Sequence, residues 1–190
     1  MAWRALSAPI TWELLSADRR TMIVLTPITQ TNVLMFKSVR LRALQESPSA
    51  FGSTYAKEAQ LTGTDWIERT ARWNGERGAG FLAMDDDDHD VAACGIAGVF
   101  LDQDDPARAH LVSMWTAPTH RRRGVGSLLV NEVISWARLR GARTLLLMVT
   151  SGNERAISFY QRLGFTRTGR TEPYPNDPTL IEYEMSRPIL

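Results

Sequence analysis

Apolar residues follow two different periodicities along this chain, and together they predict a mixed α and β fold. Runs that are apolar at nearly every position predict strands at Met22–Leu25, Gly78–Met84, Val91–Leu101, Ala109–Trp115 and Thr144–Val149. Helical spacing predicts helices at Thr31–Ser47, Thr64–Trp73 with Thr64 as N-cap, Ser127–Arg140 and Asn153–Leu163. Two more strands are expected near Phe165–Thr171 and Leu180–Ser186. The order of elements predicts the α+β class.

The first 21 residues differ from the rest, because a second methionine, Met22, begins the first strand pattern. We interpret residues 1–21 as an N-terminal extension, either a flexible arm or a start upstream of the native one. Residues 22–190 are expected to form a single domain, and a chain of 190 residues and 21.3 kDa is long enough to bury a sizeable core.

Composition and charge exclude several classes of protein. The chain has 22 Lys and Arg against 21 Asp and Glu, a formal net charge of +1, whereas a general nucleic-acid or membrane binder should be more basic. Its one cysteine, Cys94, excludes an internal disulfide and favours a reducing compartment, so we expect a cytoplasmic protein. No apolar run approaches the roughly 20 residues of a membrane-spanning helix, and we expect no secretion signal.

A metal site is not expected. The three histidines, His89, His110 and His120, lack the spacing of zinc ligands. A calcium loop starting at Asp85 would need Gly and Glu where Asp90 and Ile96 stand. The aspartate run 85–90 is therefore interpreted as a solvated hairpin tip, and Cys94 as a small core residue.

The segment Arg121–Gly126 reads Arg-Arg-Arg-Gly-Val-Gly and stands between a predicted strand and a predicted helix. Glycines allow the backbone to approach a ligand closely, and the first N–H groups of a helix are free to bind phosphate oxygens. A P-loop would need Lys and then Ser or Thr, and a dinucleotide fingerprint would need a third glycine at Leu129. The pattern therefore predicts a phosphate-binding turn of another kind.

A second motif lies in the helix that begins near Asn153. Asn153 and Tyr160 are seven residues apart and thus share one helical face, and Ala156 between them leaves room for a slender ligand. Asn153 is suited to cap this helix. A phenol with a pKa of about 10 stays protonated at neutral pH and can protonate a thiolate of pKa near 8.5. The alternative is a tyrosine that only packs, in a helix capped by Gly164.

Taken together, these motifs resemble those of the GCN5-related N-acetyltransferase (GNAT) family. Residues 121–126 match its (Gln/Arg)-x-x-Gly-x-(Gly/Ala) turn, and residues 153–160 match Asn-x-x-Ala-x-x-x-Tyr, followed by Leu163, Gly164 and Phe165. The order of elements from Met22 to Arg187 is also similar. The resemblance implies the GNAT fold, a twisted and mostly antiparallel sheet of about seven strands flanked by about four helices, with acetyl-CoA (coenzyme A) as co-substrate.

The resemblance also implies roles for individual residues. Tyr160 would be the general acid, and His110, eleven residues before Arg121, would occupy the position of a general base. The alternative for His110 is a strand-edge histidine bonded to a loop. Phe51 and Tyr55 would line the acceptor end of the cleft, or they only pack. The implied coenzyme-binding residues are Met114, Trp115, Arg121, Arg122, Arg123, Gly124, Val125, Gly126, Ser127, Asn153, Ala156 and Tyr160.

The implied reaction is direct transfer of the acetyl group to a primary amine of a small molecule or peptide, without a covalent enzyme intermediate. The alternative is a non-catalytic module that binds or senses coenzyme A. A nucleic-acid contact by Arg121–Arg123 is disfavoured, because the net charge is near zero and no aromatic platform adjoins the run. The sequence is compatible with a monomer or a homodimer.

Overall fold

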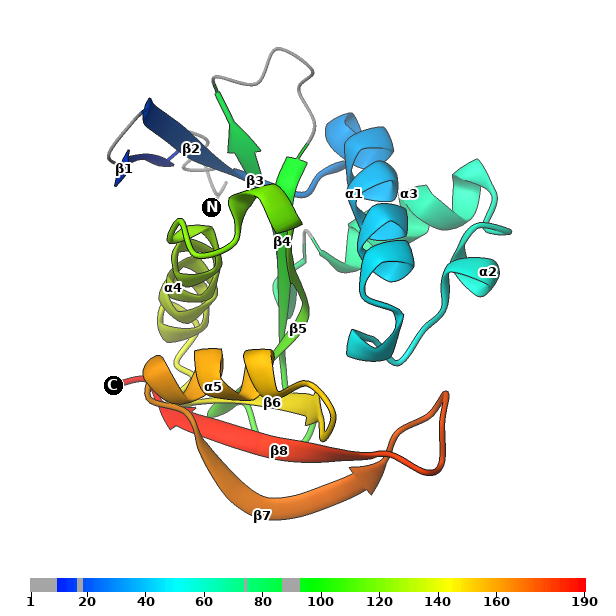
Figure 1. The fold of residues 1–190 in the computed structure, drawn as a ribbon, viewed down its shortest axis with the longest axis vertical. Coiled ribbons are helices and arrows are strands. Elements are labelled where there is room, and N and C mark those ends of the chain that lie inside the picture. The colour runs from blue at the N-terminus through cyan, green and yellow to red at the C-terminus, as the bar shows by residue number, and fades with distance from the viewer. Residues whose placement is uncertain (1–9, 17–18, 74, 87–92) are drawn as a thin grey trace.

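In the computed structural model, which describes residues 10–16, 19–73, 75–86 and 93–190, the chain forms one eight-stranded sheet (Figure 1). The strand order is β1-β2-β3-β4-β5-β6-β8-β7. Only β5 and β6 pair in parallel among the described strands, and the other neighbours are antiparallel. The strands are β1 (Ile10–Ser16), β2 (Arg19–Pro27), β3 (Gly78–Asp85), β4 (Ala93–Leu101), β5 (Arg108–Thr116), β6 (Thr144–Thr150), β7 (Thr166–Pro173) and β8 (Ile181–Pro188).

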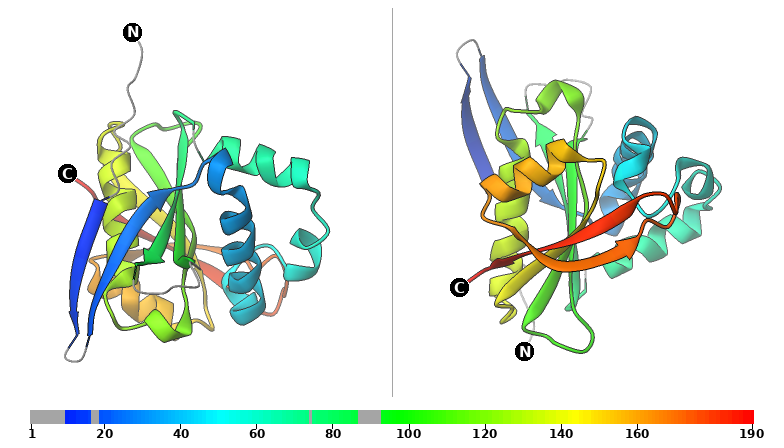
Figure 2. Two further views of the ribbon diagram at one scale, coloured as in Figure 1. Left: turned by 90° about the horizontal axis from the view of Figure 1, so that it is seen from above. Right: turned by 60° about the horizontal axis from the view of Figure 1, so that its bottom comes forward.

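Helices cover both faces of this sheet (Figures 1 and 2). They are α1 (Val33–Glu46), α2 (Tyr55–Glu58), α3 (Gly63–Arg72), α4 (Val125–Arg138) and α5 (Glu154–Arg162). The first and third of these lie on one side of the sheet, and α4 packs across β3, β4 and β5 on the other. The mixed fold predicted from the sequence and the mostly antiparallel sheet implied by the family resemblance are thereby confirmed.

The predicted apolar stripes form the core. Leu129, Val133 and Val130 of α4 are fully buried, which confirms that both stripes of this helix face inward. On the opposite side, Phe36 and Val39 turn the apolar face of α1 toward the sheet. Burial of about 25 cal/mol per Å² of apolar surface makes this two-sided packing the main source of stability.

Two elements are additional to those predicted from the sequence. The strand β1 lies within the segment interpreted as an N-terminal extension and pairs with β2 from Ile10↔Leu25 to Ser16↔Arg19. The domain boundary at residue 22 stays a prediction. The other addition is the four-residue helix α2, which lies between the two predicted N-terminal helices.

The N-cap predicted for α3 is wrong by two residues. Thr62, not Thr64, caps this helix: its hydroxyl accepts from the Asp65 N–H at 3.2 Å, and the Asp65 carboxylate accepts from the Thr62 N–H at 2.7 Å. This reciprocal capping box satisfies two backbone donors at once, which a cap at Thr64 would not do.

The strands β3 and β4 form the predicted hairpin, paired from Gly78↔Phe100 to Met84↔Ala93. Residues 87–90 of its predicted tip, His89 among them, lie outside the described residues, as does the predicted turn residue Asn74. The solvated tip predicted from residue 85 on is wrong at Asp85, which ends β3 and lies with its carboxylate 2.9 Å from His120 Nε2. Within the described part of the chain, no helix is long and apolar enough to cross a membrane.

Candidate active site

The sheet opens between β5 and β6. These strands pair only at Arg108↔Thr144, Ala109↔Leu145 and His110↔Leu146, although both strands continue beyond that point. From Leu111 to Thr116, the edge of β5 that faces β6 has no strand partner among the described residues. Backbone N–H and C=O groups on such an edge are available to a ligand that can hydrogen-bond as a strand does.

A bulge in β5 accompanies this opening. On β4, Ile96 pairs with Trp115 and Gly98 with Val112, so one residue of β4 stands opposite two of β5, Ser113 and Met114. Ser113 in this bulge has a φ of +54°, a left-handed conformation that a serine rarely adopts. A bulge bends its strand, and this one lies beyond the last residue of β5 that pairs with β6.

The predicted phosphate-binding turn follows β5 in the chain and leads into α4. Gly124 is the N-cap of α4 and has a φ of +85°, which explains why a glycine stands there. Among the described residues, nothing accepts a hydrogen bond from the N–H groups of Gly124, Val125, Gly126 and Ser127. The first N–H that bonds back belongs to Leu128, which donates to Gly124 O at 3.1 Å. The turn thus presents successive free donors at a helix N-terminus.

The two sequence motifs meet at Gly126. A Cβ on this residue would lie 3.1 Å from the Phe159 ring of α5 and 3.3 Å from Cε of Met114 on β5. The start of α4, the helix α5 and the strand β5 therefore approach one another closely at Gly126, where a larger side chain would require its neighbours to shift. Asn153 caps α5 as predicted, because its Oδ1 accepts from the Ala156 N–H at 3.1 Å. The start of α4, the helix α5 and the bulged part of β5 consequently surround one region of the molecule.

The side chain of Arg121 anchors the turn. Its Nε donates to Thr116 O at 3.0 Å, and its Nη2 pairs with Glu46 at the end of α1. Glu46 also accepts from Trp115 Nε1 at 3.0 Å. Partial burial raises the pKa of Glu46, but the hydrogen bonds from Arg121, Ser47 and Trp115 outweigh burial and hold the pKa below its usual value. Arg121 thus positions the turn relative to β5, whereas Arg122 is exposed.

Tyr160 lies on α5 with its side chain 8% exposed, between the rings of Phe159 and Phe165. Burial raises the pKa of its phenol, so the group is protonated at neutral pH. Its hydroxyl has no hydrogen-bond partner among the described residues. Its donor and acceptor positions are therefore available to a ligand atom that reaches this part of α5.

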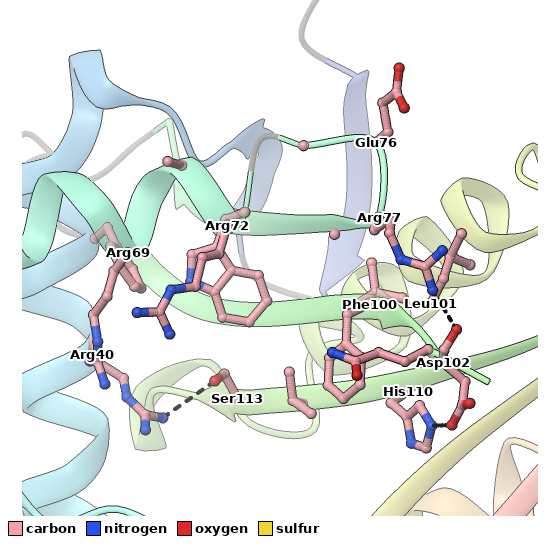
Figure 3. Close-up of a pocket in the computed structure, with 18 of the residues that line it drawn as sticks. Arg40, Arg69, Arg72, Glu76, Arg77, Phe100, Leu101, Asp102, His110 and Ser113 are labelled. Carbon is pink, nitrogen blue, oxygen red and sulfur yellow. Dashed lines mark hydrogen bonds and ion pairs between the residues drawn. The ribbon is translucent and has the colours of Figure 1, made fainter. Parts of the chain in front are cut away.

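On the side of the sheet that carries α1 and α3, a pocket of about 1060 Å³ opens against β4 and β5 (Figure 3). His110 lines this pocket, stacked on Phe100 with ring centroids 4.8 Å apart. Its Nε2 lies 2.8 Å from Asp102 Oδ2. Hydrogen bonds from His110 and from the N–H groups of Asp104 and Asp105 lower the pKa of Asp102 to about 2. A carboxylate can only accept, so Nε2 carries a proton in this contact, and Nδ1 has no hydrogen-bond partner among the described residues.

A buried charge network, which the sequence analysis missed, borders the same pocket. Arg40 donates to both oxygens of Glu58, from Nη2 at 2.8 Å and from Nε at 3.1 Å, and Arg69 binds Glu58 Oε2 at 2.6 Å. Arg40 Nη1 also reaches Ser113 Oγ at 3.5 Å, a long contact to the bulge. One signal was visible in the sequence. Arg40 lies four residues after Phe36 and before Leu44, so it interrupts an apolar stripe.

The two residues expected at the acceptor end lie outside the pocket. Phe51 is buried, and its ring lies 4.7 Å from the guanidinium carbon of Arg40. Its carbonyl accepts from the Tyr174 hydroxyl at 2.8 Å and from Asn176 Nδ2 at 3.0 Å. Tyr55 is exposed at the start of α2. The Phe51 ring therefore packs against the Arg40 guanidinium, and the acceptor roles of Phe51 and Tyr55 stay predictions. Among the described residues, no group of three or more His, Cys, Asp or Glu could hold a metal ion.

Comparisons with known proteins agree with this geometry. The family model described as acetyltransferase (GNAT) family matches residues 42–165. The [Ribosomal protein bS18]-alanine N-acetyltransferase of Salmonella typhimurium is 37% identical over 112 residues, 58% of this chain and 71% of that protein. N-acetyltransferase 8 of Homo sapiens is 30% identical over 112 residues, and the match spans 57% of this chain but only 48% of the human protein.

The fold itself is shared with solved structures. A GNAT-family acetyltransferase from Streptococcus pneumoniae superposes with a TM-score of 0.73 at 22% identity, covering 88% of this chain and 99% of that one. At this level of identity the likeness extends to the fold alone.

Proposed function

This chain belongs to the acetyltransferase (GNAT) family, and on that premise we propose that it transfers the acetyl group of acetyl-CoA directly to a primary amine. The observation that carries the proposal is the convergence at Gly126, where the free N–H groups of α4 adjoin the unpaired edge of β5 and the helix of Tyr160. Each of these elements suits a different part of an acyl-coenzyme A molecule.

The coenzyme occupies this region in the following way. Its diphosphate binds the N–H groups from Gly124 to Ser127, where the partial positive charge of the helix dipole favours anions. Its pantetheine amides hydrogen-bond to the free edge of β5 around Met114 and Trp115 in the manner of an added strand. Asn153 and Ala156 line the facing side of α5.

The acceptor approaches from the pocket on the opposite side of the sheet. An amine of pKa about 10.4 is mostly protonated at pH 7, and presenting it as the free base costs on the order of 4 kcal/mol. His110 supplies the base, because its Nδ1 lone pair is free while Asp102 holds Nε2. Asp102 is a positioning residue that fixes the tautomer of His110.

Attack of the free amine forms the N–C bond and places negative charge on the former carbonyl oxygen. A backbone N–H near the bulge of β5 stabilises this oxyanion. Collapse of the intermediate then breaks the C–S bond and releases the thiolate of coenzyme A. The phenol of Tyr160 donates to the departing sulfur. The nitrogen of the new amide loses its extra proton to solvent, and a proton from solvent restores the phenol, because burial disfavours the phenolate.

Family membership leaves the acceptor open, since one relative is named for a ribosomal-protein alanine and another, streptothricin acetyltransferase, for streptothricin. The test is therefore thiol release from acetyl-CoA across chemically diverse amines. His110→Gln should lower turnover at least tenfold at pH 7. The variant should recover as the pH rises, because the amine then deprotonates in solution. Coenzyme A binding with no thiol release for any amine would instead favour the non-catalytic module.

A further inference from the structure

The guanidinium group of Arg40 is a buried cation directed at the bulge of β5. Figure 3 shows it pointing toward Ser113, whose hydroxyl oxygen lies 3.5 Å from Arg40 Nη1. From this placement we propose that Arg40 is a catalytic residue, which stabilises the negative charge that develops on the thioester oxygen during acetyl transfer. This role rests on the proposed function and adds a side chain to the backbone N–H assigned there.

The open edge of β5 brings the sulfur end of the coenzyme close to Arg40. This edge adjoins the diphosphate turn at Met114, whose Cε lies 3.3 Å from a Cβ placed on Gly126. It ends at His110, the last residue of β5 that pairs with β6. A coenzyme arm that follows the edge away from the turn therefore brings its sulfur into the stretch that contains Ser113. Ser113 and Arg40 both line the pocket from which the acceptor approaches.

The nitrogen of Arg40 that faces the bulge retains donors for a ligand. Nε and Nη2 bind the two carboxylate oxygens of Glu58, at 3.1 and 2.8 Å. Nη1 carries two N–H groups, and its contact with Ser113 Oγ at 3.5 Å is longer than a strong hydrogen bond. These N–H groups are therefore available to an oxyanion at the bulge, to which a charge-assisted hydrogen bond is stronger than to a neutral hydroxyl.

Buried groups hold Arg40 in this orientation. Glu58, whose side chain is 1% exposed, binds the guanidinium bidentately and so fixes its plane. The Phe51 ring packs 4.7 Å from the guanidinium carbon, and the Tyr174 hydroxyl donates to the Phe51 carbonyl at 2.8 Å. Glu58 and Phe51 are thus positioning residues. A donor that is fixed before the reaction stabilises developing charge without a cost of reorganisation.

The buried network around Glu58 has more positive than negative charge. Arg40 and Arg69 both pair with this carboxylate, so two cations share one anion. Stability alone does not call for the second cation, because apolar residues of similar volume often stabilise a fold as well as a buried ion pair. A buried positive charge does favour an anion that forms beside it. The same charge disfavours an ammonium group at the bulge, in keeping with deprotonation of the amine before attack.

The experiment compares two analogues of acetyl-CoA that differ in charge but little in shape. S-carboxymethyl-coenzyme A carries a carboxylate close to the position of the thioester oxygen, and S-carbamoylmethyl-coenzyme A carries a neutral amide in its place. Calorimetry measures the Kd of each analogue, and neither measurement needs an acceptor. The wild type should bind the carboxymethyl analogue about tenfold more tightly, since a hydrogen bond to a charged group contributes that much.

Arg40→Gln is the test variant. It should bind the two analogues equally well, and with an amine that reacts in the screen above its kcat should fall about tenfold. Because Arg40→Gln leaves Glu58 with only Arg69 as an ion-pair partner, the double variant Arg40→Gln/Glu58→Gln repeats the test without an unpaired buried charge. Arg69→Gln is the matched control, since it also removes one partner of Glu58 but leaves Arg40 at the bulge. It should lower stability and keep the tenfold preference for the carboxymethyl analogue.

The outcomes separate this role of Arg40 from the proposed reaction. Equal affinity of the wild type for the two analogues, or a preference that survives in the Arg40 variants, would overturn the role, while thiol release from acetyl-CoA would leave the transferase activity standing. A loss of preference in Arg69→Gln as large as in Arg40→Gln would also overturn it, because disruption of the network would then suffice. An Arg40-dependent preference without thiol release for any amine would support the anion-binding role of Arg40 and refute the proposed reaction.

Discussion

Replacing Gly124 with alanine tests the phosphate-binding turn, and the chain supplies its own control. Gly124 precedes α4 and Gly141 follows it, and the two glycines have nearly equal φ angles of +85° and +84°. An alanine in this left-handed conformation costs roughly 1–2 kcal/mol at either site. Each variant should therefore unfold a few degrees below the wild type. Only Gly124 adjoins the free N–H groups assigned to the diphosphate.

Coenzyme A separates the two variants. At about one hundred times its Kd, a ligand stabilises the folded state by about 2.7 kcal/mol. Loss of one charge-assisted hydrogen bond at the turn, about 1.5 kcal/mol, weakens binding roughly tenfold. The same concentration then stabilises Gly124→Ala by only about 1.4 kcal/mol, while Gly141→Ala keeps the full effect. Thermal unfolding with and without coenzyme A measures both quantities. Equal stabilisation of the two variants would refute the assignment of the turn.

Three further predictions follow from single side chains. Tyr160→Phe should slow turnover at least tenfold while changing the Kd of coenzyme A less than twofold, because the hydroxyl acts on the leaving sulfur. Steady-state kinetics and calorimetry measure the two quantities, and equal effects on turnover and on Kd would contradict the role of the hydroxyl. For Glu58, burial raises the pKa, but the hydrogen bonds from Arg40 and Arg69 outweigh it and lower the pKa from 4.5 to about 2. Its stabilisation of about 3 kcal/mol is therefore complete above pH 4.5 and lost as the pH falls toward 2. In denaturant titrations Glu58→Gln should be less stable than wild type at pH 7 and lose less on acidification; parallel pH curves would refute this. Burial raises the pKa of Cys94 to about 12, so its thiol should react with a disulfide reagent only after denaturation, and reaction in the folded state would refute that burial.

Local patterns predicted the elements of this fold well. The long apolar stripes of α4 and the continuous apolar run of β6 can be recognised in the sequence, because an element that is buried on one or both faces has apolar residues on those faces. The short helix α2 has only four residues, too few for a periodicity to show. The cap of α3 was misplaced because Thr62 and Thr64 are equally good caps alone, and only the Asp65 carboxylate decides between them.

The site was only partly predictable for a related reason. Residues 121–126 and 153–160 are contiguous motifs whose backbone chemistry can be read from the sequence. The contact between Arg40 and Glu58 spans 18 residues, and that between Arg40 and Ser113 spans 73, so nothing local indicates either. The bulge at Ser113 is likewise invisible, since it depends on the register of β5 against β4. Tertiary packing created the charged pocket from residues that look unremarkable in the sequence.

A crystal structure of the protein with coenzyme A would show whether the turn before α4 binds the diphosphate. We expect the diphosphate oxygens to lie within hydrogen-bonding distance of the N–H groups between Gly124 and Ser127. The pantetheine arm should run along the unpaired edge of β5 toward Tyr160. A coenzyme bound elsewhere, with the N–H groups of this turn facing only water, would refute the proposed binding site.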